Sequence, residues 1–502
     1  MVRLKKPSRT SPKLRRQGSS SRCCSGVTCV ASVCLMLNVL VLLITLSINL
    51  RLKEQKSKGS DPEANTKSAL FSLIEGGTQN TPTKYHLIFT TDCKDPAQDW
   101  QAYIFFYHVV KSKQEGDVTR IVTGCGEGRA QLLKSAHQQQ IEPMAPGRFH
   151  LHMAPVHPKQ AEVGSLRKHM KYFNMPFGVQ HWMEEVLGYS PDALPNSLNV
   201  HDSTIIMLLD HDMAILRPLT HDFTEEKEIW RQSTNPDTTK KLFQVVSKGH
   251  LMAQHTPFPS AWWKILYMPD DILATRGIDQ LVELSDDVEN KYAAGPPMIL
   301  TACDFYPLVK QWNQFTYPMY QQLNEKILRE PHGPYALAAA ALHRPHQIAD
   351  SFSVNNYRDA GMELFQELQQ QENNNEIFCR KTPYQVKPHV LQYSKRYSLG
   401  KFVIGKHFVP GDFLGSQESC RAPMLAEPPE NIADQFNYYV DPELQGATVE
   451  LKKTSHVQQM TFLLCEMIQV LNDAATYYKE QHCSKNENGP TSVNLQKTLI
   501  FQ

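Results

Sequence analysis

The chain has 502 residues, 41% of them hydrophobic, with 52 Lys and Arg against 51 Asp and Glu. This length and composition suit one large or two ordinary globular domains. The balance of charge argues against a nucleic-acid-binding protein, which would carry a basic surplus on its folded domain.

Residues 1–82 differ in composition from the rest of the chain. Residues 1–26 are basic and contain no acid, and residues 27–50 are apolar and uncharged. That apolar stretch is long enough to cross a hydrocarbon core of about 30 Å as a helix, and the positive-inside rule places the basic tail in the cytosol. The alternative is a cleaved signal peptide, whose apolar region is shorter, roughly 7–15 residues. Residues 51–82 are polar and predict a flexible stem.

From residue 83 to 430 the pattern is that of an α/β domain. Strands are predicted at 85–91, 117–122, 148–155 and 205–209, and helices at 100–110 and 175–189. This alternation indicates a Rossmann-like nucleotide-binding half with a parallel sheet. Further along, the pattern predicts strands at 241–247 and 296–303 and a helix at 304–323 that breaks at Pro318. Residues 431–502 predict a helical extension, with a helix at 457–478 that packs on the domain.

The segment STIIMLLDHDMAILRP gives the strongest indication of a functional site. An apolar run predicts a strand buried on both faces, and open α/β sheets bind ligands at the carboxyl ends of such strands. Here the run ends in Asp210 and Asp212, whose charges repel unless each is compensated.

Three interpretations of this acidic pair are open. The acids could be structural, capping a helix and pairing with Arg217. They could belong to a haloacid-dehalogenase-type phosphatase, although Ala214 stands where that family has Thr or Val. In the third, Asp210 and Asp212 hold Mn²⁺ or Mg²⁺, which stabilises the charge that grows on the diphosphate of a nucleotide-sugar.

Several further blocks occur in a fixed order between about residues 84 and 428. They are HLIFTTDCKDPAQDWQAYIFFYHVV, NMPFGVQHWM, LLDHDMAILRPL, GPPMILTACDFYPLVKQW, HVLQYSKRYSLG and GKHFVPGDFLGSQESC. Together they resemble the plant and algal hydroxyproline O-arabinosyltransferases and the related peptidyl-serine α-galactosyltransferases. The resemblance implies an α/β domain of GT-A type behind a single N-terminal transmembrane helix, a UDP-sugar donor, and retention of the anomeric configuration.

The same resemblance implies roles for individual residues. Asp210 and Asp212 would bind the metal and the nucleotide. Candidates for holding the donor end the first strand or lie on the matched helix, and they are Thr90, Thr91, Cys93, Asn174 and His181. Asp304 would contact sugar or acceptor, or act as the base if the reaction inverts. Each has a structural alternative: a turn at the strand end, a core histidine, and a helix cap.

The third metal ligand is the open position. The family's usual His-Tyr pair is Gln392-Tyr393 here, so His389 or His407 could substitute, although a lone histidine is more often structural. Lys406 could meet the diphosphate by charge, or be a solvated surface lysine.

The expected protein is therefore a type II enzyme of the Golgi or ER membrane, with a luminal catalytic domain. It would move L-arabinofuranose from a UDP-sugar to hydroxyproline in a secretory-pathway protein; galactose transfer to serine and a non-catalytic anchored scaffold are the alternatives. Its partners would be the donor, the acceptor protein and, through residues 27–50, the membrane. In that compartment its cysteines predict one to three disulfides and a free buried thiol.

Overall fold

The computed structural model describes one compact unit that begins at Thr83. The described residues are 83–158, 170–192, 198–224, 244–256, 291–322, 332–355, 388–406, 409, 413–415, 418–429, 431–441, 447–483 and 497–498. The predicted cytosolic tail, membrane helix and stem lie outside them, as does His407. Within these ranges, every helix is too short or too polar to cross a membrane.

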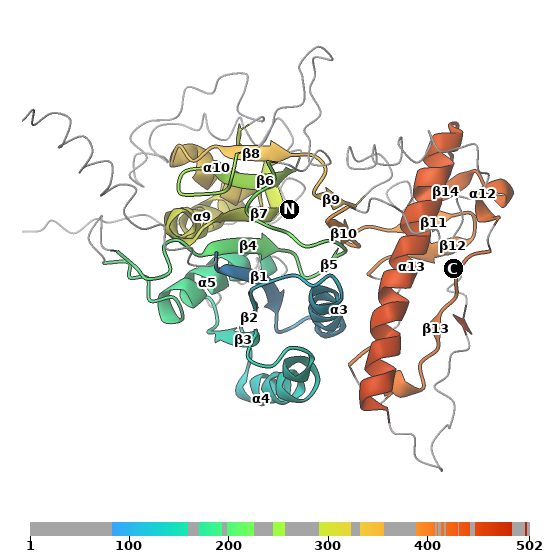
Figure 1. The fold of residues 1–502 in the computed structure, drawn as a ribbon, viewed down its shortest axis with the longest axis horizontal. Helices are drawn as coiled ribbons and strands as arrows, with labels where there is room; N and C mark the ends of the chain where they lie inside the picture. The colour runs from blue at the N-terminus through green and yellow to red at the C-terminus, as the bar shows by residue number, and fades with distance from the viewer. Residues whose placement is uncertain are drawn as a thin grey trace, which may run out of the picture. The chain divides into compact units, whose positions relative to one another are not determined.

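A seven-stranded sheet forms the centre of the unit (Figure 1). Its order is β3-β2-β1-β4-β7-β6-β8, and only β7 runs antiparallel to its neighbours. The strands are β1 (Tyr85–Asp92), β2 (Asp117–Thr123), β3 (Phe149–Ala154), β4 (Ile205–Leu209), β6 (Leu251–His255), β7 (Ala294–Thr301) and β8 (His346–Ala349). The predicted α/β class with a largely parallel sheet is confirmed.

Alternate residues of the central strands face opposite sides of the sheet, because side chains in a strand alternate. On one side, Phe89 and Leu209 join a core that includes α3 (Ala97–Lys111) and α13 (Thr454–His482). On the other, Ile88 and Leu208 join a core built with three helices (Figure 1), which are α5 (Met170–Glu185), α9 (Ala302–Gln322) and α10 (Gly333–Ala341). Every residue of β4 is buried, as its apolar run predicts.

Short elements surround this frame. They are α4 (Glu127–Ala136), η1 (His137–Ile141), η2 (Glu142–Met144), β5 (Met213–Ile215), β9 (Ser353–Val354), β10 (Val390–Gln392), β11 (Tyr397–Leu399), β12 (Phe402–Ile404), η6 (Glu418–Cys420), β13 (Met424–Leu425), α12 (Ile432–Gln435), β14 (Tyr438–Asp441), β15 (Ala447–Glu450) and β16 (Lys497–Thr498). The small sheet β5-β10-β9 matters most for the site, because it pairs Gln392 with Met213, next to the acidic pair.

The C-terminal helix α13 packs on α3, as predicted for residues 457–478. The rings of Tyr103 and Tyr478 meet edge to face with centroids 5.1 Å apart, and the His108 ring lies 3.0 Å from the carbonyl oxygen of Val470. A disulfide between Cys420 and Cys483 ties down the end of the helix.

Two sequence predictions are corrected. The helix expected to break at Pro318 continues to Gln322, because its earlier turns are anchored by buried side chains such as Trp312 and one missing backbone hydrogen bond does not end a packed helix. In the predicted strand 241–247, residues 244–247 contain no strand; a turn at Gly249 follows, and the strand is β6 instead.

Candidate functional site

The order of the strands creates a switch point between β1 and β4. From β1 the chain proceeds to β2 and β3 on one side, whereas β4 pairs with β1 on the other. All four strands are parallel, so Asp92 at the end of β1 and Asp210 just beyond β4 lie at the same edge of the sheet. Open α/β sheets bind their ligands in the crevice at such a point.

Gln392 and Lys406 contact the acidic pair. The Gln392 side-chain amide donates hydrogen bonds to Asp210 Oδ2 and Asp212 Oδ1, both at 3.2 Å. Lys406 Nζ lies 2.8 Å from Asp212 Oδ2. The Gln392 amide oxygen accepts from Asn355 at 3.2 Å, which turns the NH₂ group toward the carboxylates.

The backbone fixes these side chains in place. The Tyr393 N–H donates to the Asp212 carbonyl at 2.9 Å, and the Lys406 N–H donates to the Tyr393 carbonyl at 3.3 Å. The backbone of Asp212 is thus linked to the backbone of Lys406 through the two hydrogen bonds of Tyr393.

Charge compensation sets the protonation of Asp212, which is only 3% exposed. Burial alone would raise the pKa of its carboxyl, but the charges of Lys406 and His211 and the hydrogen bonds from Lys406 and Gln392 outweigh burial and hold the pKa below its usual value. For Lys406, burial lowers the pKa and the charge of Asp212 outweighs it, so the net pKa is raised. Asp212 and Lys406 therefore form an ion pair at neutral pH.

His332 was not among the predicted site residues. It lies just before α10 and is 4% exposed, and its Nε2 is 3.4 Å from Asp210 Oδ1. In the part of the chain that the structure describes, neither ring nitrogen has a hydrogen-bond partner. Nothing in the sequence around this histidine pointed to the acidic pair.

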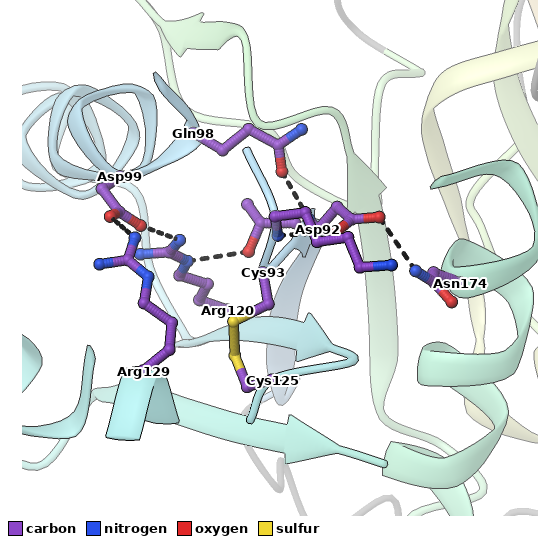
Figure 2. The surroundings of a disulfide bond; sticks show 10 residues. Asp92, Cys93, Gln98, Asp99, Arg120, Cys125, Arg129 and Asn174 are labelled. Carbon is purple, nitrogen blue, oxygen red and sulfur yellow. Dashed lines mark hydrogen bonds and ion pairs between the residues drawn. A yellow bond between two sulfur atoms is a disulfide. The ribbon is translucent and has the colours of Figure 1, made fainter. Parts of the chain in front are cut away.

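Asp92 and Asn174 meet at the end of β1, where donor binding was predicted (Figure 2). Asn174 Nδ2 donates to Asp92 Oδ2 at 3.0 Å, and the Asp92 N–H donates to Gln98 Oε1 at 2.5 Å. Asn174 Oδ1 is buried without a hydrogen-bond partner among the described residues. Asn174 therefore joins this edge of the sheet, with Asp92 as a neighbour that the sequence prediction missed.

The other predicted residues at this strand end have structural partners. Cys93 forms a disulfide with Cys125, which joins the loops after β1 and β2 (Figure 2). The Thr91 hydroxyl accepts from Arg120 Nε at 3.0 Å. Thr90 is buried at 6% exposure.

His181 lies two turns beyond Asn174 on α5, farther from the strand ends. Its Nδ1 is 2.8 Å from His152 Nε2, and burial, followed by the charge of His181, lowers the pKa of His152 to about 4. The structure places His181 beside β3 and not with the acidic pair.

Asp304 is at the opposite edge of the sheet from Asp210, so the structure does not bring it together with the acidic pair. It follows β7, which runs antiparallel to β4 and pairs Thr301 with Ile205, the first residue of β4. Its carboxylate accepts from the Gly249 N–H at 2.7 Å and the Thr301 hydroxyl at 2.8 Å, and it pairs with Arg344 at 3.2 Å. These contacts hold its carboxylate at that edge of the sheet, apart from Asp210 and Asp212.

His389, predicted as a possible metal ligand, contacts other residues and is not brought together with the acidic pair. Its Nδ1 lies 2.9 Å from the carbonyl oxygen of Pro218, and its ring packs edge to face on Phe223 and Phe352. The physical reason is strand geometry: His389 precedes β10 and aligns with the far end of β5, whereas Gln392 aligns with the near end.

The donor set of the site suits a divalent cation of the predicted kind. In the described ranges, no three Asp, Glu, His or Cys side chains converge as a ready-made metal centre. Asp210 and Asp212 nevertheless supply oxygen donors, and neither nitrogen of the buried His332 ring, which lies 3.4 Å from Asp210, has a hydrogen-bond partner there. Carboxylates with an imidazole are ligands that Mn²⁺ accepts, and substrate phosphates commonly complete such sites.

Comparison with known proteins adds a general likeness. No protein-family model matches the chain, and no curated protein matches it. Among solved structures, the galactosyltransferase LgtC in complex with donor and acceptor sugar analogs shares 12% identity at a TM-score of 0.29, covering 62% of this chain and 87% of that one. The apo-form glycosyltransferase GlyE of Streptococcus pneumoniae shares 10% at 0.30, covering 64% and 58%. Mouse xyloside xylosyltransferase 1 shares 13% at 0.29, covering 62% and 98%. At these TM-scores no residue is equated across the chains, so the function is argued from the side chains.

Proposed function

We propose that this chain is a glycosyltransferase that moves a sugar from a nucleotide-sugar to an acceptor hydroxyl. The observation that carries the proposal is the convergence of Asp210, Asp212 and Lys406 at the switch point of a largely parallel sheet. An acidic pair needs positive charge beside it, and a sugar–diphosphate bond needs positive charge where it breaks. One site at one sheet edge meets both needs.

Different side chains would contact the nucleoside and the diphosphate of the donor. Asp92 and Asn174 lie at the end of β1, where the unpaired Oδ1 of Asn174 would accept a hydrogen bond from the nucleoside. Asp210 and Asp212 would lie beside the diphosphate of a bound donor. A divalent cation, when bound there, would stabilise the negative charge that develops on the departing diphosphate. Lys406 adds a positive charge at the same end of the site.

If the anomeric configuration is retained, as the family resemblance implies, no protein side chain needs to act as the base. The departing phosphate oxygen takes the proton of the acceptor hydroxyl on the same face of the sugar. An inverting reaction would need a carboxylate on the opposite face, and Asp304, the residue suggested for that role, is held at the other edge of the sheet.

The finer parts of the proposal rest on the resemblance and on residues 1–82. The donor is a UDP-sugar, with L-arabinofuranose transferred to hydroxyproline of a secretory-pathway protein. Galactose and serine form the second donor and acceptor pair. Residues 27–50 anchor the chain in the Golgi or ER membrane with the catalytic domain in the lumen, and Mn²⁺ or Mg²⁺ is the cofactor.

A donor screen tests the proposal. Purified full-length chain is incubated with UDP-arabinofuranose or UDP-galactose and with hydroxyproline- or serine-containing peptides, in parallel with Mn²⁺ and with EDTA. We expect UDP release and a glycosylated peptide by mass spectrometry, both lost in Asp212→Asn.

The matched control is Asp222→Asn, which alters an exposed carboxylate that accepts hydrogen bonds from the backbone and hydroxyl of Thr224 within its own turn. Its turnover should equal that of the wild type. If no donor is turned over or bound under either condition, the proposal is wrong and a scaffold role is favoured. Phosphate release from a monoester without a nucleotide would favour the phosphatase interpretation.

A further inference from the structure

We propose that His332 is the nitrogen ligand of the divalent cation at the acidic pair, the role that the sequence suggested for His389 or His407. This inference rests on the proposed function, and it names a residue from an element that none of the sequence motifs contains. His332 is the N-cap residue of α10, which packs in the core on one face of the sheet, whereas β10, which carries Gln392, packs in the core on the other face.

The distance between His332 and Asp210 suits two ligands of one ion. Their facing atoms, Nε2 and Oδ1, are 3.4 Å apart, yet they do not meet the geometry of a hydrogen bond. Donors placed about 2.1–2.2 Å from one ion lie about 3.0 Å apart in octahedral and about 3.5 Å apart in tetrahedral coordination. The observed gap falls between these two values.

The other carboxylate oxygens of the pair already have partners. Gln392 donates to Asp210 Oδ2 and Asp212 Oδ1, and Lys406 takes Asp212 Oδ2. Among the described residues, His332 is the polar partner that Asp210 Oδ1 faces. The position with an uncommitted oxygen is therefore the one with an uncommitted imidazole beside it.

Burial makes this arrangement costly without a ligand. An imidazole that is 4% exposed, with neither nitrogen hydrogen-bonded within the described part of the chain, loses its contacts with water and gains none in return. A cation that binds Nε2 removes this cost. By contrast His389, the ligand suggested earlier, already has a partner in the Pro218 carbonyl.

The charge of the site requires an added cation for donor binding. Two carboxylates and one ammonium leave a surplus of one negative charge, which repels a diphosphate. A dication reverses that surplus. Because the protein supplies few ligands, the diphosphate oxygens must supply others, so Mn²⁺ and nucleotide should bind together and each should strengthen the other.

The test measures the metal directly, without turnover. Full-length chain is titrated with Mn²⁺ with and without UDP, and free Mn²⁺ is followed by electron paramagnetic resonance. Pulsed measurements on the bound ion detect coupling to a ligand nitrogen. We expect binding that UDP strengthens at least tenfold, with histidine nitrogen coupling in the wild type and in His389→Gln.

In His332→Gln that coupling should vanish and Mn²⁺ affinity should fall about 10- to 100-fold. His332→Asp serves as a second variant in case the first does not fold, and it should bind Mn²⁺ without nitrogen coupling. Labelling with ¹⁵N-histidine confirms the source of the coupling in the wild type.

The outcomes separate this inference from the proposed function. Nitrogen coupling that persists in both His332 variants, or Mn²⁺ bound through oxygen alone in the wild type, overturns the role of His332 and leaves the glycosyltransferase standing. UDP binding that needs no metal also overturns the role of His332 and leaves the proposed glycosyltransferase function standing. Failure to bind UDP under any condition, measured by calorimetry, overturns both.

Discussion

Removal of the Cys93–Cys125 disulfide should destabilise the fold by an amount that follows from the loop it closes. The two cysteines are separated by 32 positions. In the chain-entropy relation, cross-linking a loop of that size removes about 12 cal/mol/K from the unfolded chain, or about 3.7 kcal/mol at 25 °C. The double variant Cys93→Ser, Cys125→Ser should therefore lose about 3.7 kcal/mol of unfolding free energy.

Urea unfolding of the purified full-length chain, followed by tryptophan fluorescence and circular dichroism, measures this loss. The comparison is the removal of Cys420–Cys483, whose separation of 63 gives about 4.3 kcal/mol by the same relation. Cys303→Ser is the control, because Cys303 is a free thiol. A loss below about 1 kcal/mol for the Cys93–Cys125 pair, with the bond verified in the wild type by thiol counting, would refute the entropic reasoning.

Three further predictions concern stability. Burial, as the main cause, lowers the pKa of His86 and of His346 to about 3 from 6.5; stability is therefore full above pH 6.5 and falls as the pH drops, by about 2 kcal/mol per histidine at pH 5. Urea midpoints at pH 7.5 and 5 measure this, and His346→Gln should shrink the difference. Gly116→Ala should cost at least about 1 kcal/mol, because φ is +95° and a Cβ would stand 2.4 Å from the Tyr85 carbonyl oxygen; an unchanged midpoint contradicts it. Asp304→Asn should lower stability while leaving donor turnover per folded molecule within twofold, and a loss of 100-fold or more would return Asp304 to the chemistry.

Local pattern was sufficient to predict the frame of the fold. The run from Ile205 to Leu209 has no polar residue, and a strand of that kind is stable only with cover on both faces; the structure places α5 and α9 on one face and α3 on the other. Where periodicity was weak, prediction failed. Residues 244–247 looked like part of a strand, yet the adjacent Gly249 adopts a left-handed turn with φ of +82°, and the sheet pairs the residues after it.

One predicted site residue, Asp304, lies apart from the acidic pair for a topological reason. Asp304 follows a strand with a long apolar run, as Asp210 does, and the two segments look alike in sequence. Whether two strand ends share an edge depends on direction, and β7 is the one antiparallel strand of the central sheet. Direction follows from the connection between the strands, and neither apolar run encodes it.

The residues that contact the acidic pair also could not be predicted from local sequence, because the fold brings them together from distant segments. Gln392 looked like a loss, because it replaces a histidine that the family resemblance leads one to expect. In the structure its amide bridges both carboxylates, held by Asn355, and it keeps them from separating under their mutual repulsion. Gln392 therefore holds the two acids by hydrogen bonds, and we infer that a nitrogen donor to the cation comes from another element. Under the inference above His332 is that donor: its Nε2 lies 3.4 Å from Asp210 Oδ1, and it stands there because α10 packs against α9 and β7.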